Sequence, residues 1–227
     1  MISASTIKKC YRDIQNQLSY MIPEKWNSIY LYSSILTHDD YIETGEMYFY
    51  YIPKGILKRN PINVYEIPDK FSIDKEEYLQ LVDKLYNKIK KLRKLNISSG
   101  SSAWNYIIIV IEDYKFKIEY YYDNIEESEY SSYDRHQIFR YQYLNYPLSS
   151  FNKRDRQLIK NYIIESIKNP INKSIDSESI YENSVKNIIG YSNEIYNNEH
   201  YKKEERKYIP NKLTQSNEDL TNQILKS

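Results

Sequence analysis

The chain has 227 residues, enough for one ordinary domain with a remainder or for two small domains. Its formal net charge is +1, so it lacks the overall basic excess that proteins binding nucleic acid or anionic membranes carry. The single cysteine, Cys10, excludes an internal disulfide and a thiolate cluster, and the 27 tyrosines predict a polar layer at the boundary of the core.

The N-terminal third predicts one helix followed by paired strands. Apolar residues recur every three or four positions from Ile7 to Met21, which is typical of an amphipathic helix, and Pro23 ends it. β-Branched and aromatic residues predict strands over residues 25–36 and 46–52. A short third strand is expected over residues 63–67, at a sheet edge because prolines bracket it.

The middle of the chain predicts a long helix and a β-hairpin. Asp74 is the expected N-cap of a helix from Lys75 to Leu95, whose outer lysines are interpreted first as solubilising groups. Trp104 to Glu112 and Phe116 to Tyr122 form the predicted hairpin. Alternation along its second strand predicts one buried and one solvated face.

The last part of the chain predicts two helices and a polar extension. A short helix is expected over residues 134–145, and Asn152 is the expected N-cap of a helix over 152–167. We therefore expect a domain over residues 1–168 and an Asn- and Ser-rich extension over 169–227, weakly ordered or partly helical around Tyr181, Val185 and Ile188. The predicted fold class is α+β, an antiparallel sheet of four to five strands with helices packed on one face.

Motifs for catalysis, cofactors and metals are absent from the sequence. There is no HExxH, GxxxxGK[ST], GxGxxG or GxSxG, so we expect neither an enzyme nor a cofactor. His38, Asp39 and Asp40 are interpreted as a turn rather than a metal site. No apolar run approaches the ~20 residues that cross a bilayer, and the N-terminus has no apolar signal region, so a cytoplasmic protein is expected.

Residues 119–134, EYYYDNIEESEYSSYD, hold six carboxylates and five tyrosines without a lysine or arginine. Unpaired carboxylates are costly to bury, so this stretch is expected at the surface, where tyrosines could anchor a protein partner. It could equally be a solvated acidic loop. Ca²⁺ binding by Glu126, Glu127 and Glu129 would need a glycine at the bend, which is missing, and carboxylates would repel nucleic acid.

Several motifs in order resemble one known family. They are MIPEKWNSIYLYSSIL, YFYYIP, FSIDKEEY, FKIEYYYD after Trp104, and YPLSSFNKRDRQLIKNYIIES. Over Ile7 to Ile167 the chain resembles the YezG-type immunity (antitoxin) family, whose members neutralise nuclease toxins linked to type VII secretion. The family is also acidic after the Tyr-Asp strand, which agrees with Glu126, Glu127 and Glu129.

The resemblance implies a binding protein whose partner is a cognate nuclease toxin, with no direct contact to nucleic acid or membrane. We expect the acidic stretch to occupy the basic cleft of the toxin by imitating a phosphate backbone. The expected partner-binding residues are Glu119, Tyr120, Tyr122, Asp123, Glu126, Glu127, Glu129, Tyr130, Tyr133 and Asp134. The alternatives are an adaptor that keeps a secreted effector soluble without inhibiting it, and an enzyme with an enclosed pocket.

Overall fold

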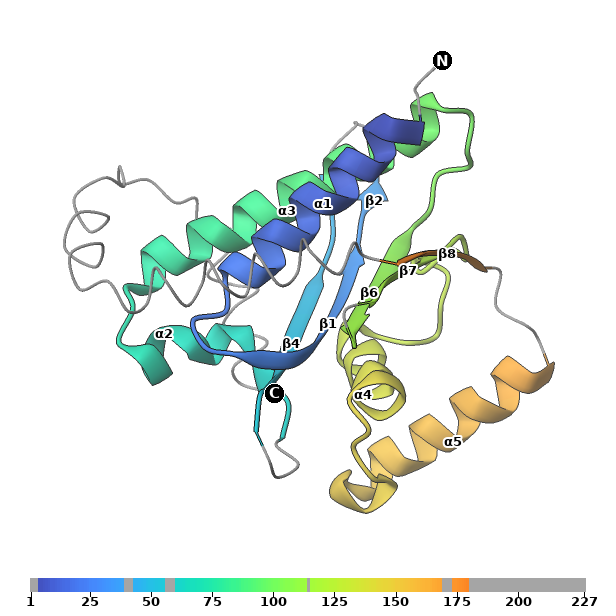
Figure 1. The fold of residues 1–227 in the computed structure, drawn as a ribbon. Coiled ribbons are helices and arrows are strands. Elements are labelled where there is room, and N and C mark those ends of the chain that lie inside the picture. Colours follow the sequence, from blue (N-terminus) through green and yellow to red (C-terminus); the bar gives the residue numbers. More distant parts are fainter. Residues whose placement is uncertain (1–3, 39–42, 56–59, 114, 169–172, 180–227) are drawn as a thin grey trace.

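The computed structural model describes residues 4–38, 43–55, 60–113, 115–168 and 173–179. Its centre is an antiparallel sheet of six strands in the order β5-β4-β1-β6-β7-β8 (Figure 1). The strands are β1 (Trp26–Ser34), β4 (Met47–Pro53), β5 (Ile62–Asn63), β6 (Tyr106–Glu112), β7 (Lys115–Tyr121) and β8 (Lys173–Ser179). Two short strands, β2 (Leu36–Thr37) and β3 (Glu43–Thr44), pair separately. The predicted α+β class with an antiparallel sheet is confirmed.

One face of the sheet is covered by two long helices. The helices α1 (Ala4–Tyr20) and α3 (Lys75–Ser98) lie side by side across it (Figure 1). Ile14 of α1, Ile89 of α3 and Phe49 of β4 belong to the same fully buried cluster. Burial of such side chains stabilises the fold by about 1.5–3 kcal/mol each. The expected N-cap of α3 is confirmed, because the Asp74 carboxylate accepts a hydrogen bond from the Glu77 N–H at 2.9 Å.

The opposite face is covered as well, which differs from the expectation that helices pack on one face. The helix α4 (Ser132–Tyr143) lies against it, and α5 (Lys153–Lys168) packs on α4. Tyr30 and Tyr32 of β1 join Phe139 of α4 in a second buried cluster. Strand β1 therefore buries seven consecutive residues, because both of its faces meet protein.

One local segment differs from the sequence prediction, while a predicted helix cap is confirmed. The strand expected over 63–67 ends after Asn63, because the Asn63 side chain accepts a hydrogen bond from the Tyr65 N–H at 3.1 Å and caps a helical turn. This turn, η1 (Val64–Glu66), leads directly into α2 (Ile67–Phe71), with Pro68 in the first turn. The cap predicted at Asn152 is confirmed, since its Oδ1 accepts from the Asp155 N–H at 2.9 Å.

The segment that follows α5 contributes a strand that the sequence did not predict. β8 pairs antiparallel with β7 from Lys173 opposite Tyr121 to Ser179 opposite Lys115. The helical turn predicted around residues 181–188 lies outside the described residues.

Candidate partner-binding surface

The acidic stretch forms the connection between β7 and α4, and its first residues are held by a single amide. Asn105, which precedes β6, donates from Nδ2 to the carbonyl oxygens of Tyr122 at 3.2 Å and Asp123 at 3.0 Å. The end of β7 is thus tied to the start of β6. This fixes the direction in which the chain leaves the sheet.

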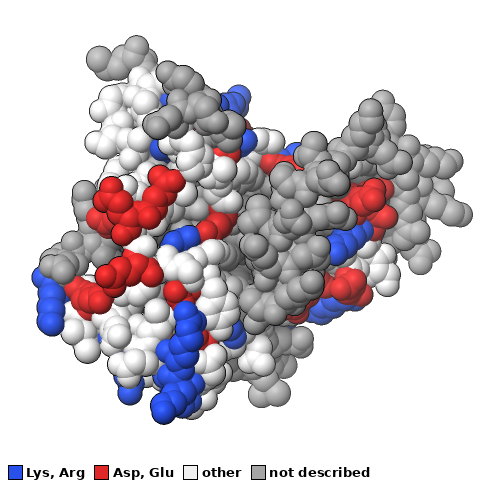
Figure 2. Space-filling model, turned by 180° about the vertical axis from the view of Figure 1, so that it is seen from behind, with Lys and Arg blue, Asp and Glu red and all other residues white. Residues whose placement is uncertain are grey.

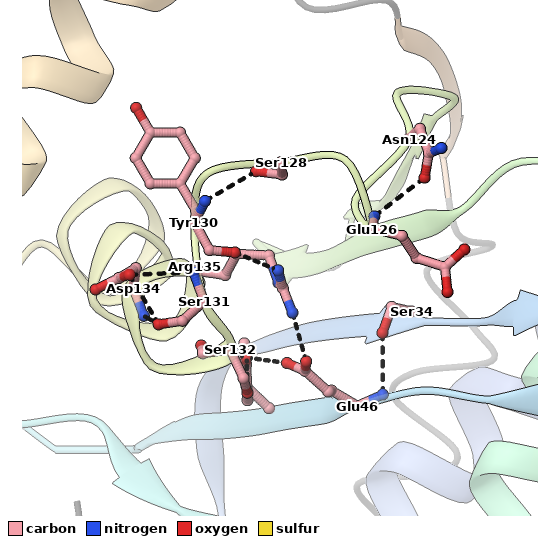
Figure 3. Close-up of polar contacts among 11 residues, drawn as sticks. Ser34, Glu46, Asn124, Glu126, Ser128, Tyr130, Ser131, Ser132, Asp134 and Arg135 are labelled. Atoms are coloured by element: carbon pink, nitrogen blue, oxygen red, sulfur yellow. Dashed lines mark hydrogen bonds and ion pairs between the residues drawn. The ribbon is translucent and has the colours of Figure 1, made fainter.

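The connection itself, loop 122–131, is shaped by two local turns and one apolar anchor. The Glu126 N–H donates to Asn124 Oδ1 at 3.0 Å, and the Tyr130 N–H donates to Ser128 Oγ at 3.2 Å (Figure 3). Such side-chain turns replace backbone hydrogen bonds in irregular segments. Ile125 is buried, so the loop is fastened to the domain at its centre.

The end of the loop is fixed by the N-terminus of α4 and by one arginine. Ser131 and Asp134 form a reciprocal capping box, in which each side chain bonds the backbone N–H of the other. Arg135 donates to the Tyr130 carbonyl oxygen and to Glu46 Oε1, both at 2.6 Å (Figure 3). Because Glu46 directly precedes β4, this arginine ties the loop to the far side of β1.

Four carboxylates of the loop are exposed, namely Asp123, Glu126, Glu127 and Glu129. Within the described ranges, no ion pair joins any of them to a lysine or arginine; Glu126 Oε1 lies 3.4 Å from His38 Nδ1. Figure 2 shows carboxylates gathered on part of the rear face, with basic side chains mostly at the border of the group. Among the described residues, the loop therefore presents to solvent negative charge that no lysine or arginine offsets.

Three of the sequence-predicted site residues are buried instead. The Tyr120 hydroxyl lies 2.7 Å from that of Tyr11, within the buried cluster that α1 and α3 form with the sheet. Glu119 is 3% exposed and pairs with Lys117 Nζ at 2.5 Å and Lys173 Nζ at 3.4 Å. Burial raises the pKa of Glu119, but hydrogen bonds from Lys117 and Tyr121 and the charge of Lys173 outweigh it, so the pKa falls to about 2.

Asp134 is the third buried residue, and its role is at the junction of α4 and α5. Beside its capping box it accepts a hydrogen bond from Arg154 Nη2 at 2.8 Å. Burial raises the pKa of Asp134, but its bonds to Ser131 and Arg154 lower it overall. Glu119, Tyr120 and Asp134 thus hold the domain together, and a partner would meet other groups first.

The remaining three tyrosines are partly buried, each with a defined support. Tyr122 packs against the buried cluster that α1 and α3 form with the sheet. The Tyr130 hydroxyl bonds the Glu165 carboxylate, and its ring meets that of Tyr162 edge-on at 5.7 Å. The Tyr133 hydroxyl donates to Asp155 Oδ2 at 2.8 Å. Rings held in this way are suited to act as rigid contact groups, since little side-chain entropy is left to lose on binding.

Of the residues that hold the loop, the sequence singled out Asp134 but neither Arg135 nor Asn105. Arg135 carries a signal, because it is the first basic residue after the acidic stretch. Asn105 carries none, since it becomes relevant only once β6 and β7 pair.

The described part of the chain contains neither a cluster of metal-ligating side chains nor a membrane-spanning helix. No group of three His, Cys, Asp or Glu side chains there is arranged to hold a metal ion. Asp39 and Asp40, considered with His38 above, lie outside the described residues. Every helix in the described ranges is too short or too polar to span a bilayer.

Comparison with known proteins gives a consistent family. The model of the family described as "Immunity protein YezG-like" matches residues 7–160. Immunity protein YezG of Bacillus spizizenii is 29% identical over 154 residues, which cover 67% of this chain and 90% of the relative. Immunity protein YezG of Bacillus subtilis is 25% identical over 67% of this chain and 96% of its own length. Type VII secretion system protein EsaG of Staphylococcus aureus is 26% identical over 60% and 79%. The chain belongs to the YezG-like immunity protein family.

Proposed function

We propose that this protein inhibits a nuclease toxin linked to type VII secretion, by placing the acidic loop 122–131 in the cleft where the toxin holds nucleic acid. The observation that carries the proposal is the set of four exposed carboxylates, Asp123, Glu126, Glu127 and Glu129, on a loop fastened at both ends. The family supplies the immunity role, and the EsaG relative is named for type VII secretion.

The mechanism follows from the electrostatics of nuclease clefts. A nuclease binds the phosphate backbone with lysines and arginines, so a row of carboxylates can take the place of phosphates there. Complementary charge accelerates encounter, while buried aromatic contacts set how long a complex lasts. Tyr122, Tyr130 and Tyr133 flank the carboxylates and are the candidate anchors.

The proposal places the protein in the cytoplasm of the producing cell, where an inhibitor meets its toxin before export. The residues 1–168 carry the binding activity in this proposal, and residues 169–227 form an extension of the family domain. No cofactor, nucleic acid or membrane takes part.

The test is an inhibition titration against the nuclease encoded beside this chain. The triple variant Glu126→Lys, Glu127→Lys, Glu129→Lys should inhibit at least about tenfold more weakly, because it reverses charge where the two potentials are complementary. A matched control reverses three exposed acids elsewhere, Glu66, Asp69 and Glu76, and should inhibit like the parent chain.

Two outcomes would contradict the proposal. Equal inhibition by the triple variant and the parent would show that the loop is not the contact surface. A stable complex that still cuts nucleic acid would identify a carrier that keeps the effector soluble.

A further inference from the structure

The strand β8 occupies what would otherwise be a long open edge of the sheet. All seven residues of β7 pair with it. At the opposite edge, β5 has only two residues and pairs with Tyr50 and Tyr51 of β4. An unpaired edge strand presents a row of free N–H and C=O groups and is a template for another strand. Without β8, all seven residues of β7 would form a long open edge that the described sheet could offer a partner.

The strand β8 comes from outside the part of the chain that the family shares. The family match ends at residue 160, and β8 begins at Lys173. Its sequence, KSIDSES, contains one aliphatic residue, so it offers little apolar area for burial. Its pairing consequently depends on main-chain hydrogen bonds, which any extended peptide could supply.

One side chain of β8 makes a specific contact with β7. Lys173 Nζ lies 3.4 Å from Glu119 Oε2 and 5.5 Å from the centre of the Tyr121 ring (Figure 1 shows the two strands). Glu119 is 3% exposed and also accepts hydrogen bonds from Tyr121 and Tyr143. A buried carboxylate in a fixed network recognises a cation in one position, so this edge selects a strand with a lysine or arginine there.

The edge is also continuous with the acidic loop. Strand β7 ends at Tyr121, and the loop begins with the next residue. A toxin segment that extends along β7 would lead directly to Asp123 and the carboxylates that follow.

We propose that the β7 edge is a strand-docking site for the toxin, which β8 occupies in the free protein. The toxin supplies an extended strand with a basic residue for Glu119, and β8 leaves as this strand enters. The inference rests on the proposed function and adds a second, main-chain component to the same interface.

A reversible disulfide between β7 and β8 tests, in the full-length chain, whether the toxin strand replaces β8. Lys115 is exposed and pairs with Ser179, and Cα atoms of antiparallel partners lie within the range of a disulfide. When oxidised, the double variant Lys115→Cys, Ser179→Cys should bind the adjacent-gene nuclease at least about tenfold more weakly. The disulfide holds β8 on β7, so no fraction of the protein has the free β7 edge that binding requires. Reduction should restore the parent affinity. The single variant Lys115→Cys is the control, and the native Cys10 is buried.

Hydrogen exchange provides the second measurement. In the complex, amides of residues 173–179 should lose protection while those of β7 keep it. Two results would overturn the inference while leaving the proposed function intact. One is undiminished protection of the β8 amides in the complex, and the other is full toxin affinity of the oxidised double-cysteine variant. Absence of binding by the parent chain would instead remove the proposed function.

A charge variant opens the edge without a disulfide. Lys173→Glu places a second acid beside Glu119, so β8 should detach. Toxin affinity should then rise about threefold or more, because a larger fraction of the molecules has a free β7 edge. Lys168→Glu has the same charge change at the exposed end of α5 and should have no effect. Dimerisation of the Lys173→Glu variant without a gain in toxin affinity would show that the edge pairs with a second copy and would contradict the inference.

Discussion

His136 of α4 is a buried titratable group that contacts two tyrosines of β4. Its Nε2 lies 2.8 Å from the Tyr50 hydroxyl, and its ring stacks on Tyr48 with centroids 4.4 Å apart. Burial, together with the charge of Arg140, lowers the pKa of His136 to about 4. The imidazole is therefore neutral in the folded protein over a range where an exposed histidine would be charged.

This gives a prediction for stability against pH. Between pH 6.5 and about 4 the unfolded chain binds a proton that the folded chain does not, so the free energy of unfolding falls as the pH falls. The slope should approach about 1 kcal/mol per pH unit, measured by urea denaturation between pH 6.5 and 5. Glu119, with its pKa lowered to about 2, adds a loss only at lower pH, as the pH falls through the range between its unfolded and folded pKa values.

Two histidine variants assign this slope. His136→Gln keeps a hydrogen-bonding group for Tyr50 but cannot titrate, so its stability should change little between pH 6.5 and 5. His38→Gln alters the half-buried histidine that follows β2 and contacts Thr44 of β3, and this variant should keep the parent slope. If both variants keep it, His136 is not the group responsible.

At the scale of elements, the close approach of β1, β4 and α3 depends on Gly45. A Cβ at this position would overlap the Ser34 carbonyl oxygen and the Tyr86 hydroxyl. These two groups are already bonded to each other at 3.1 Å, and the next residue, Glu46, pairs with Ser34. Glu46 also holds Arg135, so the packing at Gly45 reaches the acidic loop.

Gly45→Ala should therefore lower the free energy of unfolding by about 1–3 kcal/mol and also weaken toxin inhibition. The matched variant is Gly100→Ala, where φ is 95° and the added methyl group meets nothing within 4 Å. Backbone strain there should cost about 1 kcal/mol or more, without an effect on inhibition. Urea denaturation and inhibition titrations measure both. Unchanged inhibition by Gly45→Ala would contradict the link through Glu46.

The elements also show which features the sequence could predict. Local signals were sufficient for α1, for the Asp74 and Asn152 caps and for the β6–β7 hairpin, because each depends on neighbouring residues. Alternation along β7 predicted a solvated face for Glu119 and Tyr121. That was wrong because α4, distant in sequence order from β1 and β4, covers the second face.

The same limit applies to the candidate surface. The acidic composition identified the loop, but burial of Glu119, Tyr120 and Asp134 follows from tertiary contacts with Lys173, Tyr11 and Arg154. A six-residue carboxylate pattern therefore resolves into four displayed charges and two structural ones.

At the scale of the molecule, near-neutral total charge conceals separated charge. The helical layer displays Lys8, Lys9 and Arg12 on α1 and Lys84, Lys91 and Lys94 on α3. The exposed carboxylates of the loop belong to the connection between β7 and α4 (Figure 1), and Glu126 Oε1 lies 3.4 Å from Nδ1 of His38, which follows β2. Such a molecule is oriented by the field of a basic partner even though its net charge is +1.

Association with the toxin should consequently depend on ionic strength, mainly through the association rate. Between about 0.05 and 0.5 M NaCl the screening length falls to a few ångströms, so the association rate constant should drop by about tenfold or more. The dissociation rate should change less, because it is governed by the buried contacts. Surface plasmon resonance measures both rates.

Neutral variants separate steering by the loop from a general salt effect. The triple variant Glu126→Gln, Glu127→Gln, Glu129→Gln should associate slowly and with a flatter salt dependence than the parent chain. Glu66→Gln, Asp69→Gln, Glu76→Gln removes as many exposed charges from η1, α2 and α3 and should keep the parent dependence. Equal slopes for the two triple variants would mean that the loop does not steer the encounter, because charge removed at any site would then act alike.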